Sequence, residues 1–183
     1  MVDSELQQQY AGAQSRTDAK LRYTIVHLEE LCNAERRSDD FQRAHQESFL
    51  FHLFGVRDAY LQELNLFHGC GIDIEKVTKR RLEQELKNKG IQSAALERLS
   101  QVEDDQEGWL GRAKEMRNHA MHRQNILRVY HLGGEYDGEV HLKDTRSGNE
   151  IKKDYPRLFE QWVEEMRSLI QELRASCEGG GTA

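Results

Sequence analysis

The sequence is poor in proline and in paired cysteines. Pro156 is the one proline among 183 residues. Because proline breaks helix interiors, long stretches of the chain are free to be helical. The three cysteines, Cys32, Cys70 and Cys177, are far apart and form no CxxC pair. We therefore expect neither a disulfide framework nor a zinc–cysteine site, and free thiols fit a reducing cytosol.

Long apolar runs and an excess of positive charge are also lacking. Residues 1–10 are polar and lack the apolar core of a signal peptide, and no run approaches membrane-spanning length. We therefore expect a cytoplasmic protein that does not enter a membrane. The formal net charge is −6. A chain this acidic is not expected to coat DNA nonspecifically, although a small local RNA site remains compatible with it.

What is present points to a helical protein. Hydrophobic residues make up 37% of the chain and charged residues 32%. The length suits one domain with a real core. There is no internal repeat and no interdomain linker. We expect a single domain over residues 1–178, followed by a flexible glycine-rich tail at residues 179–183.

Apolar residues recur at helical spacing along most of the chain. After a loosely helical N-terminus, the expected helices cover roughly residues 18–36, 41–67, 74–89, 93–102, 106–124 and 155–173. Ser38, Asp73, Ser93 and Asp154 are expected N-caps, and Gly90 is an expected helix stop. The second helix is apolar on nearly all sides between Phe49 and Leu64. This pattern predicts a central helix that also contributes to a subunit interface.

Residues 126–143 interrupt the helical pattern. Residues 126–132 are rich in β-formers, residues 133–138 form a glycine-containing turn, and residues 140–142 alternate apolar and polar side chains. We predict a β-hairpin here, inserted before the last helix. The expected fold is all-α, an up-and-down helical bundle with a small β-hairpin insertion.

The segment Arg117-Asn118-His119-Ala120-Met121-His122 lies near the end of the fifth expected helix. Arginine forks onto phosphate, histidine takes or gives a proton near neutral pH, and asparagine donates and accepts hydrogen bonds. A metal-free ribonuclease needs these side chains. On an ideal helix, however, Arg117 and His122 diverge by roughly 140°, whereas Asn118 and His122 share a face. A working site therefore needs a frayed helix end or a second subunit across a two-fold axis.

Arg117-Asn118-(three residues)-His122 resembles the motif of the HEPN superfamily (higher eukaryotes and prokaryotes nucleotide-binding). The apolar helix Phe49–Leu64 and the Trp109-Leu110 helix start add context to the short motif. The resemblance implies a compact helical homodimer and a metal-independent endoribonuclease of the toxin or defence type. In such an enzyme His122 would act as general acid or base, Arg117 would neutralise phosphate charge, and Asn118 would orient His122 or hydrogen-bond a phosphate. It implies RNA and an antitoxin or other protein as partners, and no metal or other cofactor.

Two other functions stay open. A HEPN-like chain without catalysis would bind RNA, nucleotides or protein partners. A metal-dependent helical-bundle enzyme, such as the DinB type with three histidines in a four-helix core, is the third hypothesis. His45 and His52 lie seven residues apart on one helix face. No diagnostic spacing joins the histidines at positions 27, 45, 52, 68, 119 and 122, so we expect core or interface histidines and no metal site.

Two charged segments receive structural interpretations. Arg57-Asp58 sits inside the apolar second helix, and we expect a buried or interfacial ion pair there, or a pair that supports Arg117. Lys79-Arg80-Arg81 is flanked by glutamates, and we expect a solvated face rather than a patch that steers RNA.

Overall fold

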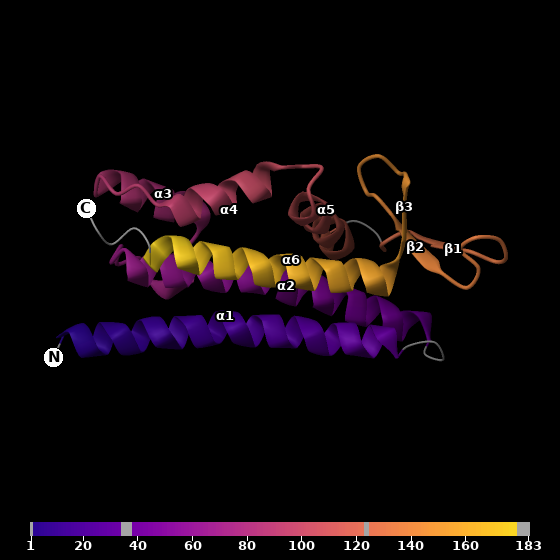
Figure 1. Cartoon of the computed structure of the whole chain (residues 1–183), viewed down its shortest axis with the longest axis horizontal. Helices are drawn as coiled ribbons and strands as arrows, with labels where there is room; N and C mark the ends of the chain where they lie inside the picture. The colour runs from indigo at the N-terminus through magenta and orange to yellow at the C-terminus, as the bar shows by residue number, and fades with distance from the viewer. Residues whose placement is uncertain (1, 34–37, 123–124, 179–183) are drawn as a thin grey trace.

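Helices account for most of the protein, and a small antiparallel sheet interrupts them (Figure 1). The computed structural model describes residues 2–33, 38–122 and 125–178, without the side chains at positions 2, 3, 122 and 178. The predicted tail at residues 179–183 lies outside the described residues. In chain order the elements are α1 (Val2–Cys32), α2 (Asp39–Phe67), the 3-10 turn η1 (Ile74–Lys76), α3 (Lys79–Asn88), α4 (Ala94–Asp104), α5 (Trp109–His122), β1 (Arg128–Tyr130), β2 (Val140–Lys143), β3 (Glu150–Asp154) and α6 (Tyr155–Glu178).

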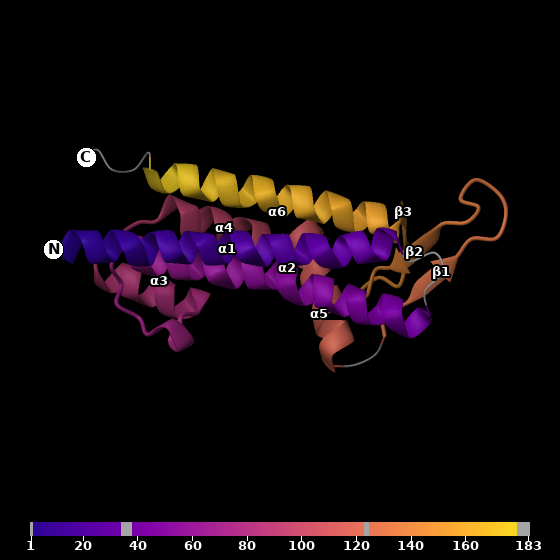
Figure 2. The same cartoon turned by 90° about the horizontal axis from the view of Figure 1, so that it is seen from below.

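The three long helices α1, α2 and α6 run side by side along the molecule (Figures 1 and 2). The shorter helices α3, α4 and α5 lie on the side of α2 and α6 that faces away from α1, and the sheet lies at the end of the molecule opposite the N-terminus (Figure 1). In the described part of the chain, no helix combines the length and the apolarity that crossing a membrane requires. The prediction of a mostly helical protein with a small β insertion is confirmed.

Helix α2 is central, as its apolar pattern predicts, and it packs on α1, α3, α5 and α6. The Ser38 hydroxyl caps its start by accepting a hydrogen bond from the Phe41 backbone N–H at 3.2 Å. The Phe49 ring stacks on Phe159 of α6, with ring centroids 4.2 Å apart. Phe51 is the exception among the apolar positions, because it is 48% exposed. The buried apolar residues of α2 are Phe49, Leu50, Leu53, Phe54, Val56, Ala59, Tyr60, Leu61 and Leu64.

Helix α6 buries the whole stripe that its sequence predicts. Its buried residues include Leu158, Phe159, Trp162, Val163, Met166, Leu169, Ile170 and Leu173. Near its end, Arg174 ties three helices together. Its guanidinium pairs with Glu63 of α2 at 2.8 Å and with Asp18 of α1 at 3.0 Å. Glu63 is 1% exposed, so this carboxylate depends on Arg174 for its counter-charge.

Several helix boundaries differ from the predicted ones, and two of these differences have a clear physical cause. Helix α1 is regular from Val2 rather than from about residue 18, because it packs along α2 and α6 and that contact overrides the polar composition of its start. The predicted helix over residues 74–89 is broken. Extended backbone at Val77 and Thr78 separates η1 from α3, and Thr78 rather than Asp73 supplies the capping oxygen. Gly90 ends α3 with a φ of +67°, as predicted.

The sheet has the strand order β1-β2-β3, with both pairs antiparallel. The predicted hairpin corresponds to β1 and β2, and β3 is a third strand that the sequence pattern did not indicate. A β-bulge lies between His141 and Leu142 of β2. Arg128 anchors the sheet to the helices, because its side chain is 1% exposed, pairs with Asp39 and donates to Gln46 at 2.7 Å. Strand β3 passes directly into α6.

Candidate functional site

Helix α5 carries the predicted catalytic residues, and its packing against α2 fixes their surroundings. Leu110, Ala113 and Met116 of this helix are buried, and Trp109 and Ala120 are partly buried against the core. The helix starts close to the preceding loop. A Cβ at Gly111 would lie within 3.0 Å of the Gln106 carbonyl oxygen. Glycine at this position therefore permits the backbone contact that sets the start of α5.

Arg117 is half-buried and is held by an aromatic ring. Its guanidinium carbon lies 5.4 Å from the centroid of the Phe54 ring of α2. The Arg117 Nε atom is buried and has no hydrogen-bond partner among the described residues. Within the same residues, no carboxylate forms an ion pair with Arg117, whereas Arg112 on the same helix pairs with Glu107 at 3.5 Å. The Arg117 guanidinium is therefore supported by an aromatic ring and has no acidic partner among the residues that the structure describes.

The structure describes the other residues of the predicted catalytic segment in less detail than Arg117. Asn118 and His119 are half-buried. The His119 Nε2 atom is buried and lacks a hydrogen-bond partner in the described part of the chain. His122 is the last residue of α5, and its side chain lies outside the described residues. The backbone stays helical through this position, so positions 117 and 122 are about 140° apart around the helix axis. One copy of α5 does not place them on the same face.

The Arg57-Asp58 segment ties helices together. Arg57 forms ion pairs with Glu103 of α4 and, at 2.7 Å, with Asp58. Lys79 of α3 also pairs with Glu103, at 3.1 Å. These contacts hold α2, α3 and α4 against each other. Because Lys79 is paired with Glu103, only Arg80 and Arg81 of the basic segment 79–81 are exposed.

A histidine cluster lies between α1 and α2. The Nδ1 atoms of His27 and His45 are 3.1 Å apart, and the His27 ring stacks on His52 with centroids 5.3 Å apart. Burial of the ring and the neighbouring His45 lower the pKa of His27. Burial and the charge of Lys20 lower the pKa of His52. Half-buried imidazoles that bridge two helices fit the predicted core or interface role.

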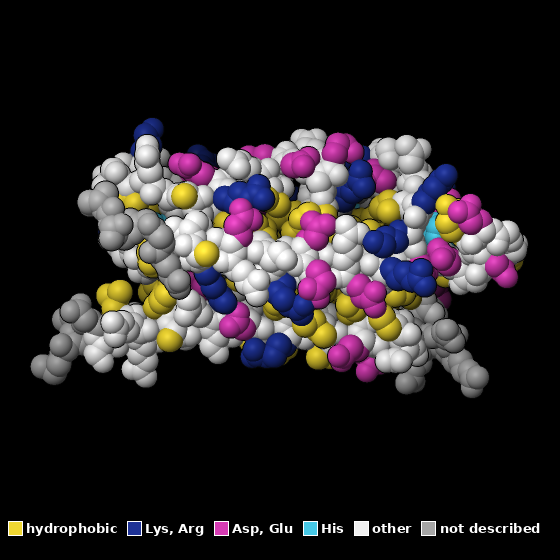
Figure 3. All heavy atoms as spheres, viewed as in Figure 1, with side chains coloured by type: hydrophobic (Ala, Val, Ile, Leu, Met, Phe, Trp, Pro, Cys, Tyr) yellow, Lys and Arg dark blue, Asp and Glu magenta, His cyan; other side chains and the backbone are white. Residues whose placement is uncertain are grey.

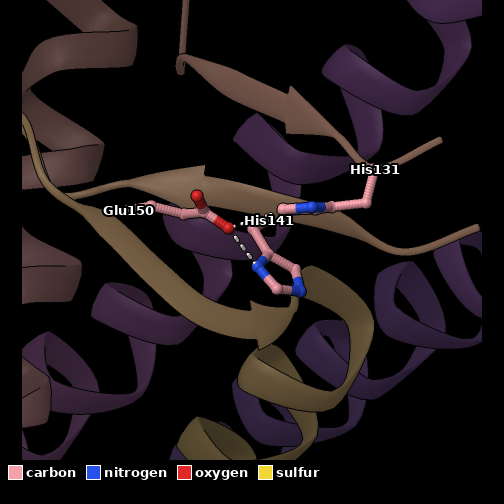
Figure 4. Close-up of side chains that lie close together, drawn as sticks. All are labelled: His131, His141 and Glu150. Carbon is pink, nitrogen blue, oxygen red and sulfur yellow. Dashed lines mark hydrogen bonds and ion pairs between the residues drawn. The ribbon is translucent and has the colours of Figure 1, made fainter. Parts of the chain in front are cut away.

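The sheet contains a second group of ionisable side chains, His131, His141 and Glu150 (Figure 4). The Glu150 Oε1 atom lies 2.5 Å from His141 Nδ1 and 2.6 Å from His131 Nε2. One ligand atom from each of the three residues lies within 4.8 Å of the other two. His131 follows β1, His141 belongs to β2 and Glu150 begins β3. Strand pairing thus brings together three residues that lie on three successive segments of the sheet.

His141 has carboxylates at both ring nitrogens. Its Nε2 atom lies 2.6 Å from Glu139 Oε2, on the side of the ring away from Glu150. His141 is 0% exposed, and the edge of the Tyr136 ring packs on both histidines. Burial of the ring opposes its positive charge, but the hydrogen bonds to Glu139 and Glu150 outweigh burial and raise the pKa of His141.

Sequence reasoning missed this second group, because it compared the other six histidines and not His131 and His141. One signal was available. The two histidines flank the predicted turn, and Glu150 follows the next turn, Thr145–Gly148. The register that joins them depends on the unpredicted strand β3 and on the bulge in β2.

Comparison of the chain with family models, with curated proteins and with solved structures gave no match. The two groups of side chains, on α5 and in the sheet, are therefore the observations from which function is inferred.

Proposed function

We propose that the protein is a HEPN-like, metal-independent endoribonuclease that acts as a homodimer, and that its helices form an up-and-down bundle of the HEPN type. The observation that carries this proposal is the state of Arg117. Its guanidinium rests on Phe54, and no carboxylate among the described residues neutralises it. A half-buried arginine that has no acidic partner among the described residues and lies near a polar helix end suits a phosphate group better than a purely structural role.

The chemistry needs no cofactor. The ribose 2′-hydroxyl attacks the adjacent phosphorus, the P–O5′ bond breaks, and a 2′,3′-cyclic phosphate and a 5′-hydroxyl result. Arg117 stabilises the charge that develops on the phosphoryl oxygens. His122 takes the proton of the attacking hydroxyl or protonates the leaving oxygen. Asn118 orients His122 or donates to the phosphate.

A dimer supplies the geometry that one helix lacks. Positions 117 and 122 are about 140° apart around the axis of α5, so one copy separates the arginine from the histidine. Around a two-fold axis, Arg117 of one copy faces His122 of the other. Two exposed apolar residues flank the end of α5, with Met121 49% exposed and Leu127 52% exposed. A subunit contact over these residues would bury both.

The surface charge agrees with a local RNA contact. On the face shown in Figure 3, lysine and arginine side chains are interspersed with aspartate and glutamate. With a net charge of −6, the protein lacks the excess of positive charge that coating a long nucleic acid requires. A few phosphates bound at the α5 site are consistent with both facts.

The first test is RNA cleavage in EDTA. The wild-type protein should cut RNA from a broad panel that includes tRNA and leave 2′,3′-cyclic phosphate ends. Arg117→Ala and His122→Ala should each abolish cutting with little change in melting temperature. Arg112→Ala is the matched control, because Arg112 lies on the same helix, is 40% exposed and already has an acidic partner. It should cut like the wild type.

The second test asks whether the site is shared between subunits. Arg117→Ala and His122→Ala proteins are mixed and allowed to exchange subunits. In a shared site, the mixed dimer contains one intact pair, so cutting returns to a measurable fraction of the wild-type rate. A strictly monomeric protein by light scattering, or no recovery in mixed dimers, contradicts the shared site.

The remaining outcomes identify the other functions. Intact RNA that is bound by the wild type and released by Arg117→Ala indicates a non-catalytic HEPN-like binding module. Cutting that stops in EDTA and returns with added metal indicates a metal-dependent enzyme. If the protein neither cuts RNA nor binds RNA in a way that depends on Arg117, the proposal is rejected.

A further inference from the structure

We propose that His131, His141 and Glu150 bind one divalent ion of the zinc class, and that this ion joins the three segments of the sheet. The proposal is independent of the ribonuclease at α5. It rests on the placement of two imidazole nitrogens and one carboxylate oxygen within 4.8 Å of one another (Figure 4).

The donor set selects the kind of ion. Imidazole nitrogen suits Zn²⁺ and similar transition metals, whereas Mg²⁺ and Ca²⁺ prefer oxygen ligands. Two histidines and one glutamate make a three-ligand zinc site, which leaves a fourth position for water. The site therefore discriminates between zinc and magnesium, and this difference is measurable.

Glu139 supplies the orientation that such a site needs. Its Oε2 atom lies 2.6 Å from His141 Nε2, so it accepts the proton carried by that nitrogen. In the ion-free structure His141 Nδ1 donates a hydrogen bond to Glu150, and an ion that displaces this proton binds the freed Nδ1 lone pair. A carboxylate behind a metal-binding histidine fixes the ring and its tautomer in this way. An ion at Nδ1 also separates this nitrogen from the Glu150 carboxylate and satisfies both.

One ligand of the proposed site is held in place by packing, and the other two can move. His141 is 0% exposed and is wedged against Tyr136, so its ring is held in place. The side chains of His131 and Glu150 are 21% and 27% exposed, which leaves an entry from solvent. The present contacts of Glu150, at 2.5 and 2.6 Å, are shorter than the separation of about 3.3 Å between two ligands of tetrahedral zinc. Glu150 must therefore withdraw by less than about 1 Å when the ion enters.

The ion would stabilise the sheet and its contact with α5. Its ligands come from three segments that short strand pairs hold together. The turn between β2 and β3 reaches α5, because Arg146 pairs with Glu115 at 3.3 Å. Metal binding that joins separate segments adds directly to folding stability.

The test is a zinc titration of the full-length, tag-free protein after metal has been stripped with EDTA and the EDTA removed. Competition with a coloured chelator should show one tight site per chain, and Mg²⁺ should not compete. Zinc at about one hundred times its Kd should raise the melting temperature by roughly 5 °C. Co²⁺, used as a probe ion, should give visible absorption typical of nitrogen and oxygen ligands.

Variants assign the ligands. His131→Ala and Glu150→Gln should each weaken zinc binding by about a hundredfold or more, and Glu139→Gln by roughly 10- to 100-fold. These partly exposed positions are preferred to His141, because replacing a fully buried ring risks unfolding. His68→Ala is the control, because His68 is half-exposed and contacts Ser93 at 3.0 Å. It should bind zinc like the wild type.

The proposal is overturned if the wild type has no tight zinc site, or if His131→Ala and Glu150→Gln bind zinc as tightly as the wild type. Loss of binding in His27→Ala alone would assign the ion to the α1–α2 histidines instead. RNA cleavage in EDTA is scored separately. Failure of either proposal therefore leaves the other intact.

Discussion

The guanidinium of Arg117 lies over the ring of Phe54, 5.4 Å from its centroid. A core residue of α2 thus supports the candidate phosphate-binding group of α5. The cationic head is held by an uncharged partner, so its charge remains available to an anion.

The first prediction concerns this support. Phe54→Leu keeps an apolar side chain of similar size in the core but removes the ring beneath Arg117. We expect RNA cleavage or binding to fall about two- to five-fold, since a cation–π contact contributes about 0.5–1 kcal/mol. The measurement is the rate or affinity on one RNA substrate. Phe51→Leu, on the same helix but 48% exposed, should leave both unchanged. Equal effects of the two variants would contradict the role of the ring.

The second prediction compares two glycines. Gly111→Ala places a Cβ against the backbone of Asp105 and Gln106, whereas a Cβ at Gly12 meets nothing within 4 Å. We expect Gly111→Ala to destabilise the protein by about 2 kcal/mol, because backbone cannot yield as a side chain does. Gly12→Ala lies inside α1 and should stabilise it by up to about 1 kcal/mol. Urea denaturation of both variants measures the difference, and a stable Gly111→Ala would show that the start of α5 can shift.

The third prediction concerns pH. Burial of Glu103 opposes its charge, but the hydrogen bonds and charges of Arg57 and Lys79 outweigh burial and lower the pKa of Glu103. A carboxylate with a lowered folded-state pKa stabilises the protein above its unfolded pKa of about 4.3. That contribution is lost as the pH falls through the folded pKa.

Glu103→Gln should therefore be less stable than the wild type by about 2 kcal/mol at pH 7. The difference should shrink below about pH 4.3. Urea denaturation from pH 7 to pH 3 checks both parts. Glu83→Gln on α3, an exposed position, should show no such difference at any pH. If the stability difference between Glu103→Gln and the wild type stays constant with pH, the ionised Glu103 carboxylate is not its source.

The fourth prediction concerns the pair of Arg174 and Glu63. Arg174→Met leaves the Glu63 carboxylate, 1% exposed, without a cation and should cost about 3–5 kcal/mol. The double variant Glu63→Met/Arg174→Met removes both charges and should recover most of this loss. Arg98→Met breaks an exposed pair with Glu172 and should cost less than about 1 kcal/mol. If the double variant is as unstable as the single one, burial of an unpaired charge is not the cause.

The sequence was sufficient to predict the buried residues where one face of a helix packs on the core. The stripe from Leu158 to Leu173 and the apolar positions of α2 other than Phe51 were predicted because burial follows the helical period. The caps at Ser38 and Ser93 and the stop at Gly90 were predicted because each depends on a local hydrogen bond or backbone angle.

What the sequence did not reveal depends on contacts between distant segments. Strand β3, Glu-Ile-Lys-Lys-Asp, has one apolar residue and becomes a strand through pairing with β2. The meeting of His131, His141 and Glu150 follows from that pairing and from the bulge beside His141. For Arg117, the pattern gave its residue type and helix position, but only the packing of α5 on α2 showed that Phe54 supports it.

No residue lies between β3 and α6, so the sheet and the last helix share one continuous backbone. Glu150 and Tyr155 belong to one continuous piece of regular backbone, and α6 has 24 residues, or about 36 Å of stiff rod. The sheet is therefore tied through one continuous element to the far end of the molecule, where Arg174 pairs with Glu63 of α2 and with Asp18 of α1.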